Sequence, residues 1–121
     1  MTQAKEALLA NPAQAFGYMR LEPDASAGAS GNLRQQLIQF AGDHGYQLVE
    51  IFVEPPDPAA SAFAALIEAL HNSEARTVIV PSLHHFAHLD SLQLAMKELL
   101  ERETNARVMT VAGDQGLDDS Q

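Results

Sequence analysis

The chain has 121 residues, 46% of them hydrophobic, and a formal net charge of −9. This length suits a single domain with a packed core, and the negative charge argues against direct binding of nucleic acid, which needs clustered Lys and Arg. The chain has no cysteine, which excludes disulfides, thiolate zinc sites and cysteine nucleophiles. Its first residues are polar and no stretch approaches the roughly 20 apolar residues that span a bilayer, so we expect a cytoplasmic protein without membrane contact.

Apolar periodicity predicts strands and helices in alternation. Good helix formers over residues 3–10 predict a short leading helix, and aromatic and large apolar residues predict a first strand over 15–21. A loop of small residues follows over 22–32, and then an amphipathic helix from Leu33 to Ala41, which Gly45 ends. Further strands are predicted over 46–53, 77–80 and 107–111, and further helices over 59–71 and 89–102.

This order predicts a three-layer α/β fold, in which a mostly parallel four-stranded sheet carries helices on both faces. We place the domain at residues 14–113, with a helical extension over 1–13 and a flexible acidic tail over 114–121. Ligands of such sheets bind beyond the carboxyl ends of the strands. Here those ends carry residues 20–32, 54–58, 81–88 and 112–114.

Several segments agree in order and spacing with one known family. Phe16-Gly17-Tyr18-Met19-Arg20-Leu21 is similar to an opening Y-x-R-x-S strand, and the segment from Val78 to His88 lies where that family has V-V-x-x-L-D-R-L-x-R. The helix with Gln36 and Leu37 and the helix over 63–70 also fit. Over roughly residues 15–112 the chain therefore resembles the N-terminal catalytic domain of the serine recombinases, the resolvase/invertase family. The resemblance implies a resolvase-like fold in a degenerate and truncated member.

The family's active site does not map onto this chain. A phosphoserine link to DNA needs a hydroxyl nucleophile and several guanidinium groups. Only Arg20 matches an active-site position of the family. Glu22 stands where the family has its nucleophilic serine, and His84 stands where it has an aspartate. The family's two arginines are replaced by His85 and His88, and its R-P pair by Ala60 and Ser61. We therefore expect no recombinase activity and no enzyme of this class.

The histidines after the third strand suggest a metal site. In a helix, His84 and His88 lie one turn apart on one face, and imidazoles at that spacing hold zinc or nickel, with Glu22 as a third ligand. The alternative is that His85 and His88 are exposed to solvent, with His84 hydrogen-bonded to a carbonyl group. A divalent metal is the only cofactor that the sequence suggests.

Two further features have a structural and a functional interpretation. Arg20 and Glu22 point to the same side of an extended strand, where they form a salt bridge or Glu22 serves as a general base. The segment Gly28-Ala29-Ser30-Gly31-Asn32 lies between a strand and a helix, where it is a flexible connector or a cradle for phosphate. It lacks both GxGxxG and the P-loop lysine.

Three functions remain open. The first is a catalytically inactive recombinase-like domain that regulates or assembles through protein contacts or self-association, using the leading helix or the helix over 89–102. The second is a metal-binding or enzymatic protein built on His84, His85, His88 and Glu22. The third is an accessory protein that associates with a true recombinase.

Overall fold

Four parallel strands in the order β2-β1-β3-β4 form the centre of the molecule. The computed structural model describes residues 13–21, 27–55, 61–87 and 89–112. In chain order the elements are β1 (Ala13–Arg20), α2 (Ala27–Asp43), β2 (Tyr46–Glu54), α3 (Ala62–His71), β3 (Thr77–Val80), the 3-10 turn η1 (Leu83–His85), α4 (Asp90–Thr104) and β4 (Arg107–Thr110).

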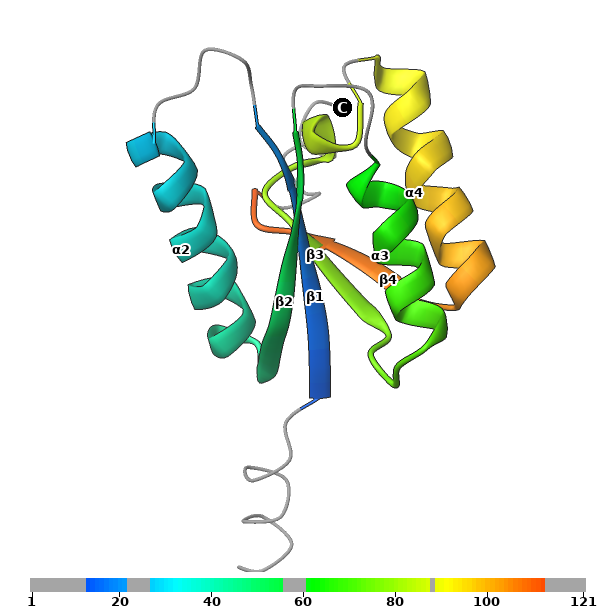
Figure 1. The fold of residues 1–121 in the computed structure, drawn as a ribbon, viewed down its shortest axis with the longest axis horizontal. Helices are drawn as coiled ribbons and strands as arrows, with labels where there is room; N and C mark the ends of the chain where they lie inside the picture. The colour runs from blue at the N-terminus through cyan, green and yellow to red at the C-terminus, as the bar shows by residue number, and fades with distance from the viewer. Residues whose placement is uncertain (1–12, 22–26, 56–60, 88, 113–121) are drawn as a thin grey trace, which may run out of the picture.

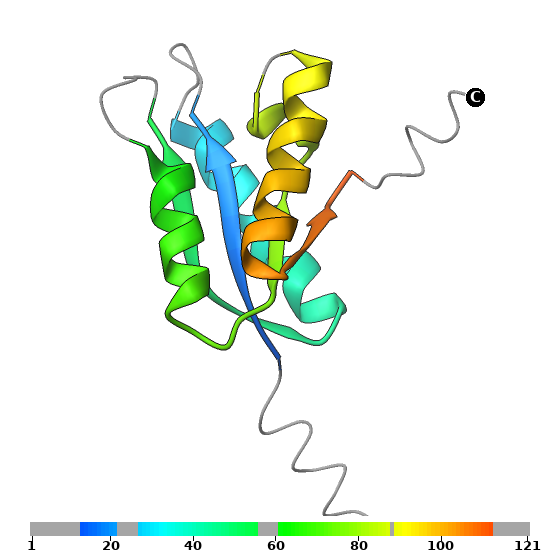
Figure 2. The same ribbon diagram turned by 90° about the vertical axis from the view of Figure 1, so that its right-hand side faces the viewer.

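The sheet separates two layers of helices (Figure 1). Helix α2 covers one face, and α3 and α4 lie beside each other on the opposite face, as the turned view in Figure 2 also shows. Because a parallel connection needs a crossover, each helix joins two parallel strands and packs back on the sheet. The predicted three-layer α/β architecture is confirmed.

Side chains of β1 alternate between two hydrophobic cores. Phe16 and Tyr18 face α3 and α4, whereas Ala15 and Met19 face α2. Between them, Gly17 lets α2 approach closely: a Cβ atom there would lie 3.1 Å from Ile51 Cγ1 and 3.3 Å from Leu37 Cδ1. β1 is thus buried on both faces, as an inner strand of a parallel sheet must be.

Strand β2 contains a bulge that the sequence did not reveal. Ala15 pairs with Leu48 and Phe16 pairs with Glu50, so Val49 has no partner on β1 and is exposed. The extra residue resets the alternation, and Leu48 and Ile51 therefore both face α2 although they are three residues apart. After the reset, Glu54 faces α3.

The predicted loop over 22–32 is wrong in its second half, because α2 already begins at Ala27. The segment from Gly28 to Asn32 is helical and is neither a flexible connector nor an open phosphate-binding loop. Leu33, Leu37 and Ala41 pack this helix against the sheet, and packing of that kind offsets the low helix propensity of glycine. The predicted end at Gly45 is confirmed, since its φ is +82°.

The remaining predicted strands agree with the structure to within one or two residues, and the last helix extends to Thr104. The leading helix and the acidic tail lie in residues 1–12 and 113–121, outside the described residues, so the domain limits stay predictions. β1 itself starts at Ala13. Among the described residues, no helix is both long and apolar enough to cross a membrane.

Candidate functional site

The carboxyl ends of β1 and β2 and the turn η1 after β3 meet at one edge of the sheet, where the sequence predicted a site. Arg20 ends β1, Glu54 ends β2, and Leu83–His85 form η1. Two polar arrangements hold this edge together. One joins Arg20 to η1, and the other joins Tyr18 and Glu54 to the start of α3.

Arg20 is half-buried and binds the main chain of η1 and of Phe86, the residue that follows η1. Its Nε donates to the carbonyl of His85 over 3.2 Å, and its Nη2 donates to the carbonyl of Phe86 over 3.0 Å. The backbone N–H of Arg20 also donates to His85 Nδ1 over 2.9 Å. A planar guanidinium suits two adjacent acceptors, so Arg20 fixes η1 against β1 at three points.

The two described histidines of η1 differ in their surroundings. His85 is half-buried, and because its Nδ1 accepts a hydrogen bond, its neutral ring carries the proton on Nε2. The interpretation that His85 is simply exposed is therefore wrong. His84 is the exposed one, and within the described part of the chain its ring has no hydrogen bond to a carbonyl.

The α-helix that was predicted to carry His84 and His88 is not present over the described residues 84–87. The 3-10 turn ends at His85, and Phe86 and Ala87 are not helical. Glu22 and His88 lie outside the described residues, and no group of three metal-ligating side chains occurs within those that are described. The divalent metal stays a prediction.

Tyr18 and Glu54 form a buried pair on the α3 side of the sheet. The Tyr18 hydroxyl donates to Glu54 Oε1 over 2.9 Å, and Tyr18 is fully buried. Burial raises the pKa of the Tyr18 phenol far above its usual range, and the hydrogen bond to the Glu54 carboxylate and its charge raise it further, while Arg20 opposes them. At neutral pH Tyr18 therefore acts as a proton donor in a hydrogen bond.

The same carboxylate caps α3. Glu54 Oε1 also accepts the backbone N–H groups of Ala62 and Phe63, each over 3.1 Å, and the Ser61 hydroxyl accepts the N–H of Ala64 over 3.1 Å. These are the first three helical N–H groups, which have no partner within the helix. A negative charge at a helix N-terminus is favourable, so Glu54 ties β1, β2 and α3 together.

Aromatic rings fill the space below these polar contacts. Phe86 follows η1, and its ring centroid lies 5.4 Å from that of Tyr18 and 5.8 Å from that of Phe63 on α3. Because Arg20 binds the Phe86 carbonyl, the clamp on η1 also positions this ring. The two polar arrangements are thus joined through one aromatic cluster.

Sequence reasoning identified Arg20 and His85 but missed Tyr18 and Glu54. In the sequence, Tyr18 belongs only to the opening strand that resembles the family's, and Glu54 only to the residues 54–58 at the carboxyl end of a strand, without a role for either side chain. A signal was present, since Ser61 just before an apolar run is typical of a helix N-cap. Glu22, Ala60 and His88 are outside the described residues, so the Arg20–Glu22 salt bridge stays a prediction.

No protein-family model matches the sequence, and no curated protein matches it. Solved structures do match. The chain is similar to the C-terminal catalytic domain of ISC1926 TnpA, an IS607-like serine recombinase, with a TM-score of 0.69 and 15% identity over 88% of this chain and 76% of that one. It is also similar to the N-terminal catalytic domain of TP901-1 integrase, with a TM-score of 0.67 and 16% identity over 82% of this chain and 77% of that one.

A third similar structure is a resolvase family site-specific recombinase from Streptococcus pneumoniae, with a TM-score of 0.65 and 16% identity over 83% of this chain and 72% of that one. The chain therefore has the fold of the serine recombinase catalytic domains, and the resemblance is confirmed at the level of the fold.

The expectation that the chain is not an enzyme is contradicted by this comparison. Two of the structures that share its fold are described as catalytic domains of recombinases. The expectation rested on substituted positions, and three of these, Glu22, Ala60 and His88, lie outside the described residues. Nothing in the structure shows that the chain lacks activity.

Proposed function

We propose that the chain acts through contacts with another protein and that the recombinase-type fold serves as the scaffold for its contact surface. The observation that carries this proposal is a row of apolar side chains on the outside of α4 and at its start. Leu89, Leu92 and Leu99 are 64%, 47% and 37% exposed, and Met96 is half-buried between them. We call these four residues the α4 strip.

The spacing of Leu92, Met96 and Leu99 places these three side chains on one side of α4, and Leu89 is the residue directly before the helix. The intervals are three, four and three residues, which corresponds to neighbours on successive turns. Single exposed leucines are common on protein surfaces, but contiguous apolar surface marks a contact site more often than chance. The α4 strip is a candidate of the second kind.

The strip lies on the side of α4 that faces α3. The next position along the same row is Glu103, whose carbonyl contacts the His71 ring of α3 over 2.9 Å, and Met96 packs against the core beneath both helices. The opposite side of α4 faces β4, where Glu101 accepts the N–H of Val108. Leu94 is 52% exposed on that opposite side and so provides a matched control.

Site-specific photocrosslinking tests the proposal. A photoreactive residue at position 92 or 99, in the full chain expressed in its own host, should give one discrete adduct, whereas the same residue at 94 should give none. The adduct is identified by mass spectrometry, and the purified partner is then bound to the wild type. Equal crosslinking from all three positions, or from none, would contradict the proposal.

A further inference from the structure

We infer that the partner of the α4 strip presents an amphipathic helix with basic residues beside its apolar side. This inference rests on the proposed function and names the chemistry of the partner. Three properties of the strip support it: its shape, the charges around it, and the rigid attachment of the helix that carries it.

The shape of the strip fits one helix. Leu89 and Leu99 are ten residues apart, which corresponds to about 15 Å along a helix. An exposed surface that is one row of side chains wide accommodates a partner helix whose anchors are spaced three and four residues apart. A globular face would need a broader area, since stable protein–protein interfaces bury about 800 Å² on each partner.

The charges around the strip are mostly negative. Glu103 continues the row of the strip and is exposed, and Glu68 on the neighbouring helix α3 is exposed as well, against the exposed Arg102, which lies one turn after Leu99. The whole chain has a formal net charge of −9. Complementary charges steer partners together and suppress wrong ones, so basic residues suit the edges of the partner helix.

The same charges disfavour a second copy of this chain as the occupant. A two-fold contact through α4 would bring two acidic helices together, because α4 carries Asp90, Glu98, Glu101 and Glu103 against Lys97 and Arg102. Like charges across an interface cost free energy. A basic partner helix would gain electrostatic free energy from this contact, whereas a second copy of the chain would lose it.

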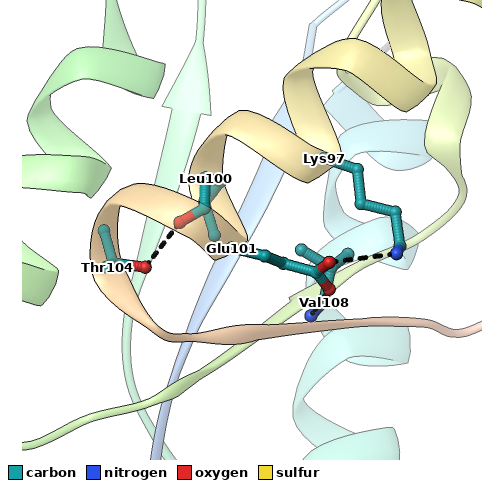
Figure 3. A network of polar contacts seen from close by, with 5 residues as sticks. All are labelled: Lys97, Leu100, Glu101, Thr104 and Val108. Carbon is teal, nitrogen blue, oxygen red and sulfur yellow. Dashed lines mark hydrogen bonds and ion pairs between the residues drawn. The ribbon is translucent and has the colours of Figure 1, made fainter.

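Polar contacts on the other side of α4 hold it in place (Figure 3). Glu101 Oε1 lies 3.2 Å from Lys97 Nζ, and Glu101 Oε2 accepts the N–H of Val108 on β4 over 3.0 Å. At the other end of the helix, Gln93 Nε2 donates to the Ala87 carbonyl over 3.0 Å. The Lys97–Glu101 pair and the hydrogen bond of 2.7 Å from Thr104 to the Leu100 carbonyl lie within α4, so the contacts of Glu101 with β4 and of Gln93 with Ala87 are the ones that attach the helix. The strip is therefore presented by a fixed helix, which reduces the entropic cost of docking.

A peptide titration followed by amide NMR of the full chain tests the inference. The probe is a synthetic helical peptide of Leu, Ala and Lys, with leucines three and four residues apart and lysines on both flanks. We expect shifts centred on α4 and α3, a weakening of at least about tenfold for Leu92→Ser/Leu99→Ser, and unchanged affinity for Leu94→Ser. These leucines are exposed, so the variants should fold, which urea unfolding checks.

A second peptide with glutamates in place of the lysines separates charge from apolar contact. We expect it to bind about tenfold more weakly at low salt. Equal binding of both peptides, or equal binding of the two leucine variants, would overturn the inference. So would a dimer of the chain alone that Leu92→Ser/Leu99→Ser dissolves, because the occupant would then be a second copy. Crosslinks at position 92 without peptide binding would overturn the partner chemistry and leave the proposed function standing.

Discussion

Tyr18 on β1 donates a hydrogen bond to Glu54 on β2, and the oxygen that accepts it also caps α3. One carboxylate thereby connects three elements at the edge of the sheet. Because Glu54 is buried, we expect its removal to leave the groups that it binds without a hydrogen-bond acceptor.

Replacement of Glu54 by alanine should destabilise the fold by about 2–3 kcal/mol, because the Tyr18 hydroxyl is left buried without an acceptor and α3 loses two of its capping contacts. Tyr18→Phe should cost about 1 kcal/mol, since Glu54 keeps both amide donors. Urea unfolding of both variants and of the double variant gives the coupling between them. Glu50→Ala, an exposed glutamate of the same strand, is the control, and an equal loss there would contradict the account.

Stability should fall at alkaline pH because of Tyr18. Its pKa is raised in the folded state by burial first and by Glu54 second, so the folded chain holds this proton more tightly than the unfolded chain. That contribution is complete below the ordinary tyrosine pKa of about 10 and is lost as the pH rises above it. Tyr46→Phe leaves Tyr18 as the only phenol, and tyrosinate absorbance should then appear together with unfolding. Ionisation well before unfolding would refute this.

The clamp of Arg20 on η1 should depend on the guanidinium and not on charge alone. Arg20→Lys keeps the charge but cannot bind two adjacent carbonyls in one plane, so we expect a loss of about 1–2 kcal/mol and faster amide exchange at Phe86. Arg34→Lys on the exposed side of α2 should change stability by less than about 0.5 kcal/mol. If both substitutions behave alike, Arg20 is not a clamp.

Two glycines should respond to alanine in opposite directions. Gly17→Ala forces a methyl group against Ile51 and Leu37 and should destabilise by about 1–2 kcal/mol. Gly31→Ala meets no atom within 4 Å in the helix α2 and should stabilise by about 0.5–1 kcal/mol. Thermal unfolding of the two single variants decides this, and a stabilising Gly17→Ala would show that α2 packs less closely than described.

Deletion of Val49 should be tolerated, because it removes the bulge and leaves the paired residues on their present faces. Deletion of Ile51 also shortens the strand by one residue, but in a regular register it turns Glu50 toward α2 and should cost several kcal/mol. Circular dichroism and urea unfolding compare the two. Equal damage from both deletions would mean that Val49 is needed for the fold.

The sequence predicted the strands and helices because apolar periodicity is local. It predicted that the strands are parallel, but not their order in the sheet. It also missed the bulge at Val49, which is evident only from the pairing of β2 with Ala15 and Phe16 on β1. The polar contacts at the edge join residues far apart in the chain: 36 positions separate Tyr18 from Glu54, and 65 separate Arg20 from His85. Such partners follow from tertiary packing, which no local pattern encodes.

The early start of α2 has a similar origin. The glycines and small polar residues from Gly28 to Asn32 have low helix propensity or favour turns, so the local pattern indicated a loop. The packing of Leu33 and Leu37 against the sheet makes this segment helical instead. The α4 strip, in contrast, could be predicted in part from the sequence, because its leucines follow a helical spacing. The sequence did not predict that these leucines are exposed.

Binding of a protein partner by the α4 strip is tested most directly by affinity. The measurement is the affinity of the purified, crosslink-identified partner for three forms of the chain: wild type, Leu92→Ser/Leu99→Ser and Leu94→Ser. We expect equal affinity for the wild type and Leu94→Ser, and a loss of at least about tenfold for the double variant. Equal affinity for all three forms would contradict it.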